Sequence, residues 1–105
     1  MIYLIIWRYD IHAAARDAFE QAYGPTGDWA ALFSASPDYL GTHLLREVTQ
    51  PDRYVTIDFW RTAEAFLDFK TTWHAAYAAL DQHCATLTMT ETHLGSFYSQ
   101  TDWAA

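Results

Sequence analysis

The chain has 105 residues and a formal net charge of −7, with six lysines and arginines against thirteen acidic side chains. This length suits one domain, and the acidic balance disfavours nucleic acid and anionic membrane surfaces as partners. No apolar run approaches the ~20 residues that a membrane-spanning helix needs, so we expect a cytoplasmic protein.

The first third of the chain is predicted to form a strand followed by two helical segments. Residues 2–9 are rich in β-branched and aromatic side chains, which predicts a strand, and Asp10 follows as a candidate helix cap. Residues 13–23 repeat apolar side chains at helical spacing, and Gly24-Pro25 ends that helix. Residues 29–33 then form a short helical piece within a connection.

The rest of the chain is predicted to form a β-hairpin, a long helix and a last strand. Residues 39–46 and 53–60 are strand-like and are joined by a polar connector, so they should pair antiparallel. Thr62 can cap a helix from Ala63 whose apolar stripe continues to Cys84. Residues 86–98 predict the last strand, with a bulge or bend at Gly95.

This order, β-α-β-β-α-β, predicts an α+β fold of the split βαβ or ferredoxin-like type, with a four-stranded antiparallel sheet. Residues 1–100 should form one domain and residues 101–105 a loose tail. Two main helices can cover only one face of such a sheet. The other face must be polar or buried against something else.

The hairpin register decides which side chains share a face. If Arg46 lies opposite Arg53, the helices cover an aliphatic set, and an aromatic set is left open. The chain has five Trp, seven Tyr and six Phe, more ring surface than one small core hides easily, so a homodimer is the expected cover of the open face. The open set comprises Tyr3, Ile5, Trp7, Tyr9, Tyr39, His43, Leu45, Tyr54, Thr56, Asp58 and Trp60.

Four segments of the chain form a familiar combination: Tyr39–Arg46, Arg53–Trp60, Tyr77–Asp81 and Leu94–Phe97. Together they resemble the antibiotic biosynthesis monooxygenase superfamily of dimeric α+β barrels. The resemblance implies the dimeric barrel fold. It also implies one of several chemistries, because members include cofactor-independent monooxygenases of aromatic polyketides, quinol oxygenases and haem-degrading enzymes.

The resemblance also assigns site positions. Polyketide-oxidising members carry a Trp at the end of the third strand, matched by Trp60, and a Tyr on the following helix, where this chain has Phe66. The positions that serve haem in haem-degrading members correspond here to Ile6, Phe69 and Ala78 or Ala79, which implies that no haem is bound.

Two residues are candidate catalytic bases. His43 could take a proton from a phenolic or enolic substrate, or it could be a hydrogen-bonded interface histidine. Asp58 lies in an apolar, aromatic strand, where it could act as the base, orient His43, or pair with an arginine across the dimer.

Other residues are candidate substrate contacts. Arg46 could bind a substrate carboxylate or enolate, as could Arg8, although surface ion pairing explains both equally well. A planar ring could stack on Trp60, Phe66, Trp7 or Tyr54, for which simple packing is the alternative. No histidine or cysteine spacing gathers metal ligands, and no glycine-rich phosphate loop is present, so we expect neither metal nor cofactor.

Two classes of function remain open. The chain is either a cofactor-free monooxygenase of a small aromatic or polyketide-type phenol or quinol, or a non-catalytic dimeric module that binds a small molecule or stabilises an assembly. An isomerase or cyclase on the same barrel would need the same acid and base without oxygen.

Overall fold

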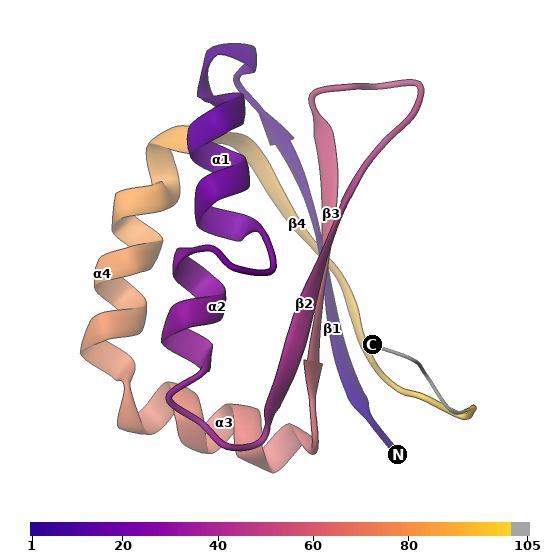
Figure 1. Ribbon diagram of the computed structural model, residues 1–105, viewed down its shortest axis with the longest axis vertical. Coiled ribbons are helices and arrows are strands. Elements are labelled where there is room, and N and C mark those ends of the chain that lie inside the picture. The colour runs from indigo at the N-terminus through magenta and orange to yellow at the C-terminus, as the bar shows by residue number, and fades with distance from the viewer. Residues whose placement is uncertain (102–105) are drawn as a thin grey trace.

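The computed structural model describes residues 1–101 and consists of one sheet with helices packed against it (Figure 1). None of the helices in this part of the chain is long and apolar enough to cross a membrane. The strands are β1 (Tyr3–Ile11), β2 (Tyr39–Arg46), β3 (Arg53–Trp60) and β4 (Thr88–Tyr98). The α-helices are α1 (Arg16–Tyr23), α2 (Asp28–Phe33), α3 (Ala63–Thr72) and α4 (His74–Cys84), with 3₁₀ turns at Ala13–Ala15 and Ala85–Leu87.

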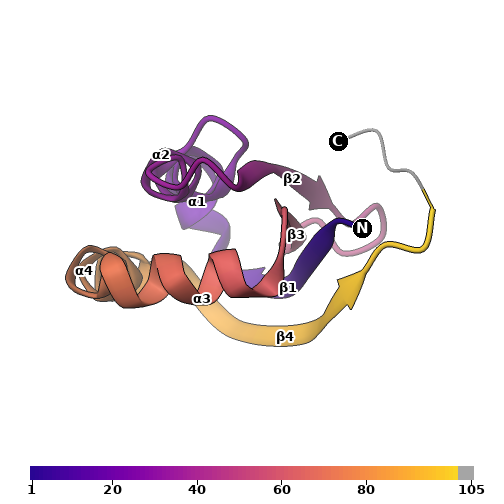
Figure 2. The same cartoon turned by 90° about the horizontal axis from the view of Figure 1, so that it is seen from below.

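The four strands are antiparallel and follow the order β2-β3-β1-β4 across the sheet. Helices α1, α2 and α4 lie on the same side of the sheet (Figures 1 and 2). The predicted α+β, ferredoxin-like fold is therefore confirmed. The tail predicted to be loose lies outside the described residues, apart from Thr101.

Several local signals act as expected, and one does not. The Thr62 hydroxyl accepts a hydrogen bond from the Ala65 amide at 3.1 Å and so caps α3. The long apolar stripe is interrupted at Trp73, where α3 ends and α4 begins. The prediction of Asp10 as a helix cap is wrong, because β1 continues through it and Arg53 Nε donates to its carboxylate at 2.8 Å.

The predicted hairpin register is wrong by one residue over most of its length. Arg46 lies opposite Tyr54, not Arg53, and Thr42 lies opposite Asp58. The expected pairing holds only at the far end, where Tyr39 lies opposite Trp60. A register shift between Tyr39 and Gly41 separates the pair that follows the expected register from the pairs that are displaced by one residue.

The faces predicted for β1 and β3 are exchanged in the structure. The aromatic side chains of these strands, which we expected on the open face, pack under the helices. Tyr9, Tyr54 and Trp60 are buried there, together with Phe19 of α1 and Phe69 of α3. The opposite face is mainly aliphatic and is not covered by the helices. It presents Ile6, Arg8, His43, Leu45, Val55, Ile57 and Phe97, as the pairing of their strands requires.

Candidate active site

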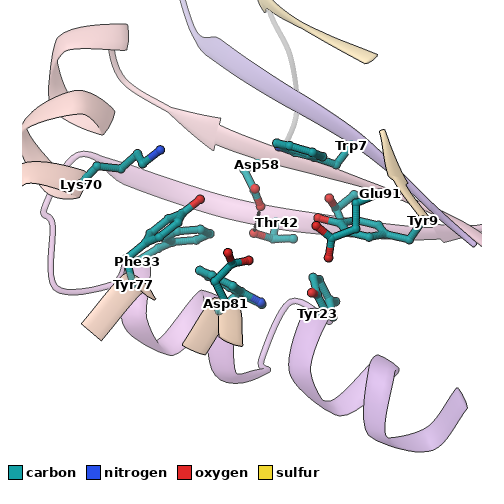
Figure 3. A pocket seen from close by; sticks show the side chains of 12 residues that line it. Trp7, Tyr9, Tyr23, Phe33, Thr42, Asp58, Lys70, Tyr77, Asp81 and Glu91 are labelled. Carbon is teal, nitrogen blue, oxygen red and sulfur yellow. Dashed lines mark hydrogen bonds between the residues drawn. The ribbon is translucent and has the colours of Figure 1, made fainter. Parts of the chain in front are cut away.

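A cavity of about 260 Å³ lies between the sheet and the helices (Figure 3). Strand side chains form one wall, and helical aromatic side chains form the other. Large rings on β1, α1, α2 and α4 surround this space, and two of them, Trp29 and Tyr77, meet edge to face at a centroid distance of 5.0 Å. The lining comprises Trp7, Tyr9, Tyr23, Trp29, Phe33, Thr42, Thr56, Asp58, Lys70, Tyr77, Asp81 and Glu91.

Asp58 of β3 supplies a carboxylate to the interior of this cavity. Thr42, its neighbour on β2, donates a hydrogen bond to Asp58 Oδ1 at 2.6 Å. The Thr42 hydroxyl has only one proton, so Tyr39, whose hydroxyl lies 2.6 Å from Thr42 Oγ1, is the donor in the next link. The result is a chain of two hydrogen bonds from Tyr39 through Thr42 to Asp58.

The surroundings of Asp58 favour its protonated form. Burial raises the pKa of its carboxyl from 3.8 to about 6, and the hydrogen bond from Thr42 opposes this increase. The side chain keeps partial access to the cavity, but it is recessed from bulk water. A carboxyl with such a pKa is suited to general base catalysis near neutral pH.

Three tyrosines of the lining hold their phenolic protons firmly. Burial is the largest cause of the raised pKa of Tyr9 and of Tyr23. It also raises the pKa of Tyr77 to about 12, with further contributions from the charges of Asp81, Asp58 and Glu91. These phenols are therefore hydrogen-bond donors at neutral pH and not bases.

Charged side chains from three elements surround the mouth of the cavity. Asp81 of α4 and Glu91 of β4 point toward the same space in Figure 3. Loss of solvation raises the pKa of Glu91, and the charge of Asp81 raises it further. Lys70 of α3 places its ammonium 4.9 Å from the ring centroid of Tyr77.

Of the residues predicted as functional, the cavity lining contains Asp58 and Trp7. His43 lies on the opposite face of the sheet, against the ring of Phe59 at a centroid distance of 4.8 Å. The expectation that His43 shares a face with Asp58 is therefore wrong. Arg46 is exposed at the end of β2, where its Nε donates to the Pro51 carbonyl at 2.9 Å.

The other predicted contacts lie under the helices but outside the lining. Trp60 is fully buried and meets Phe66 edge to face at 5.3 Å. Tyr54 is buried too; its hydroxyl donates to Glu20 and accepts from Arg16 at 2.9 Å. Arg8, placed with the helix-side set from the sequence, lies instead on the open face, because its neighbours Trp7 and Tyr9 point to the cavity.

Sequence reasoning missed most of the lining, including Thr42, Tyr77, Asp81 and Glu91. The missing information was the register, because pairing Thr42 with Asp58 places the polar centre of the hairpin under the helices. Asp81 could have been found from its spacing, because it follows Tyr77 by one helical turn and therefore lies on the same side of α4.

The family model of the antibiotic biosynthesis monooxygenases matches residues 1–79. The chain belongs to this family. A search of curated proteins found no significant match.

Solved structures share the fold over nearly the whole chain. A mutant of SnoaB, a cofactor-independent oxygenase from Streptomyces nogalater, superposes with a TM-score of 0.78 at 24% identity, over 96% of this chain and 95% of that one. A Bordetella bronchiseptica protein named after the same family gives a TM-score of 0.76 at 16% identity, over 95% and 98% of the two chains. A mutant of MhuD with two manganese protoporphyrin IX groups per active site gives 0.71 at 26% identity, over 98% and 99%.

The lining described here does not suit a haem. It contains no histidine, cysteine or methionine to ligate iron, and burial disfavours the tyrosinate form of Tyr9, Tyr23 and Tyr77. Asp81 and Glu91 would also repel the propionates. Among the described residues, no group of three or more His, Cys, Asp or Glu side chains could hold a metal ion.

Proposed function

We propose that this chain is a cofactor-independent monooxygenase that oxidises a small phenol- or quinol-type aromatic substrate in the cavity between the sheet and the helices. The observation that carries the proposal is Asp58, a carboxyl with a pKa of about 6 inside an aromatic cavity. Family membership and the likeness to SnoaB, itself a cofactor-independent oxygenase, support it.

The first step of the proposed reaction is proton removal by Asp58. The substrate is a phenol whose ring system carries an activated CH₂ group, as in an anthrone. Trp7 and Phe33 provide flat apolar walls for its rings, and the Thr42 hydroxyl holds the carboxylate in place. Poor solvation raises the basicity of Asp58, so that it can accept this proton at neutral pH.

The substrate anion then supplies the electrons for oxygen reduction. It transfers one electron to O₂, and recombination forms a C–O bond and a peroxide. Protonation by Asp58 and loss of water leave a carbonyl on the carbon. One oxygen atom thus enters the product, the other leaves as water, and the CH₂ group provides all four electrons. The aromatic walls of the cavity limit the access of bulk water to the anion.

Oxygen uptake by the purified protein tests this proposal. Anthrones should be consumed with O₂ faster than in buffer alone, and Asp58→Asn should lower kcat by about 10²- to 10⁴-fold. Glu64→Gln makes the same carboxylate-to-amide change at an exposed position of α3 and should leave the rate unchanged. Uptake no faster than the uncatalysed rate would contradict the proposal.

His43→Asn distinguishes the two bases considered from the sequence. Because His43 lies across the sheet from the cavity, its replacement should leave kcat within a few-fold of the unaltered protein. A loss equal to that of Asp58→Asn would assign the base to His43 instead.

A non-catalytic binding module is the second candidate. It is favoured by the position of Arg46 and Tyr54 outside the lining, which leaves Lys70 as the one cationic side chain among the described lining residues. Saturable binding of aromatic ligands without oxygen uptake or isomerisation would support this second function.

A further inference from the structure

The cavity combines aromatic walls with an excess of negative charge. Asp58, Asp81 and Glu91 face it, against the single ammonium of Lys70 among the described lining residues. We propose that the substrate of this cavity is an arylalkyl amine, a planar ring system that carries a protonated aliphatic amino group, and that this group binds between Asp81 and Glu91. The inference rests on the proposed function in taking this cavity as the substrate site.

In the described part of the chain, the two carboxylates at the mouth, Asp81 and Glu91, have no ion-pair partner. The Thr88 hydroxyl donates to Glu91 Oε1 at 3.3 Å, which is a long hydrogen bond to a neutral group. Like charges held close together without a counter-ion favour the binding of a cation from outside.

A third carboxylate lies deeper in the same space. Asp58 accepts one hydrogen bond, from Thr42 to Oδ1, and no described residue donates to Oδ2. The charges of Asp58, Asp81 and Glu91 all disfavour ionisation of Tyr77, which indicates that their fields overlap within the cavity. A carboxylated substrate would enter against this field, and an ammonium-bearing one would enter with it.

The walls themselves suit a cation. Lys70 places its ammonium 4.9 Å from the ring centroid of Tyr77 and 5.7 Å from that of Phe66, which are cation–π distances. Trp7 and Tyr23 add further ring faces around the same volume (Figure 3), and Trp29 also lines it. Aromatic walls with nearby carboxylates are the chemistry by which proteins recognise organic ammonium groups.

The proposed charge also fits the proposed reaction. When Asp58 takes a proton from the substrate, the negative charge moves from the carboxylate to the substrate anion, and the total charge of the cavity does not change. The substrate's own ammonium then offsets the negative charge of the substrate anion. Arg46 and Tyr54 cannot do so, because neither of them lines the cavity.

Matched naphthalene ligands test the inference by calorimetry on the full chain at neutral pH. 1-Naphthylmethylamine is cationic, 1-naphthalenemethanol is neutral and 1-naphthoate is anionic, on the same ring. The amine should bind at least about tenfold more tightly than the carboxylate, and added salt should reduce this ratio because it screens the charges at the mouth. Equal affinities, a preference for the carboxylate, or no saturable binding of the amine would overturn the inference.

Variants locate the preference within the structure. Asp81→Asn and Glu91→Gln should each weaken amine binding several-fold and bring the amine and the carboxylate closer in affinity. Glu64→Gln changes the net charge equally at a surface position outside the lining and should leave the ratio unaltered. An equal effect of all three variants would assign the preference to net charge and overturn the proposed site.

The two proposals fail separately. Oxygen uptake from anthrones without any charge preference in binding would overturn the arylalkyl amine inference and leave the monooxygenase proposal in place. A clear preference for the amine without oxygen uptake from any anthrone, with or without an amino group, would overturn the monooxygenase and keep the ligand class.

Discussion

Asp58 is held where its ionised form is poorly solvated, so function and stability oppose each other at this residue. Its folded-state pKa of about 6 lies above the ordinary 3.8, so between about pH 4 and pH 6 the folded chain binds more protons at this site than the unfolded chain does. Stability from this residue therefore falls as the pH rises through that window. The full difference is about 3 kcal/mol above pH 6, because each pKa unit corresponds to ~1.4 kcal/mol.

We therefore expect Asp58→Asn to inactivate the protein and to stabilise it. The amide can still accept from Thr42 but carries no charge to desolvate, so the free energy of unfolding at pH 7 should rise by up to about 3 kcal/mol. Denaturant unfolding at pH 7 and below pH 4 measures this. The gain should vanish at the lower pH, where the wild-type carboxyl is protonated in both states. A gain that is independent of pH would show that the low solvation of Asp58 is not its cause.

The hydrogen bond from Thr42 lowers the pKa of Asp58 and so opposes the increase caused by burial. Thr42→Val removes the hydroxyl that donates to Asp58, so the pKa of Asp58 should rise and the acidic limb of the pH–rate profile should move to higher pH. Thr56→Val is the matched control, because Thr56 also lines the cavity but forms no hydrogen bond with Asp58. Equal shifts from both variants would contradict a specific role for Thr42.

At the scale of secondary structure, the bulge in β2 organises the site. Without it, Tyr39 and Thr42 would point to opposite faces, because they are three positions apart and side chains alternate along a strand. The register shift between Tyr39 and Gly41 places both on the helix side, where their hydroxyls lie 2.6 Å apart. Gly41 permits this with a φ of +134°.

Gly41→Ala tests the bulge directly. A Cβ at this position meets no atom within 4 Å, so the cost is backbone strain alone, and we expect a loss of about 1–3 kcal/mol in the free energy of unfolding. D-Alanine at the same position, introduced by chemical ligation, adopts positive φ readily and is the matched control. Chemical denaturation compares the three proteins, and equal midpoints for the L and D variants would show that φ at Gly41 is not constrained.

The same bulge explains how far sequence reasoning could go. Strand and helix positions follow from periodicity, and the bounds of β2 and β3 were predicted as observed. The faces of the strands were not predicted correctly, because both sides of this sheet are apolar. Alternation of side chains alone does not determine which side the helices cover. Pairing Tyr39 with Trp60 was right, but an extra residue before Gly41 shifts every later pair. The cavity lining could not be found without that shift.

In the whole molecule, this register leaves a mainly aliphatic surface on the face of the sheet opposite the helices. The side chains of Ile6, Val55 and Ile57 lie side by side across β1 and β3, and Leu45 and Phe97 at the flanks are about half exposed, at 48% and 49%. Arg8 lies among them, and its Nε is buried without a hydrogen-bond partner among the described residues. A surface of this kind favours burial against a second copy, whose acceptors could also satisfy the guanidinium.

The homodimer expected from the sequence thus stays a prediction, now based on the aliphatic face. Sedimentation of the unaltered chain at micromolar concentration should give a dimer, and Ile57→Lys should shift it to a monomer with unchanged secondary structure, because a second charge beside Arg8 would be buried at the interface. Leu67→Lys makes a comparable change on α3, where Leu67 is 60% exposed, and should stay dimeric. An unaltered chain that sediments as a folded monomer would mean that this face is stable in water, and the aliphatic surface would then need another partner.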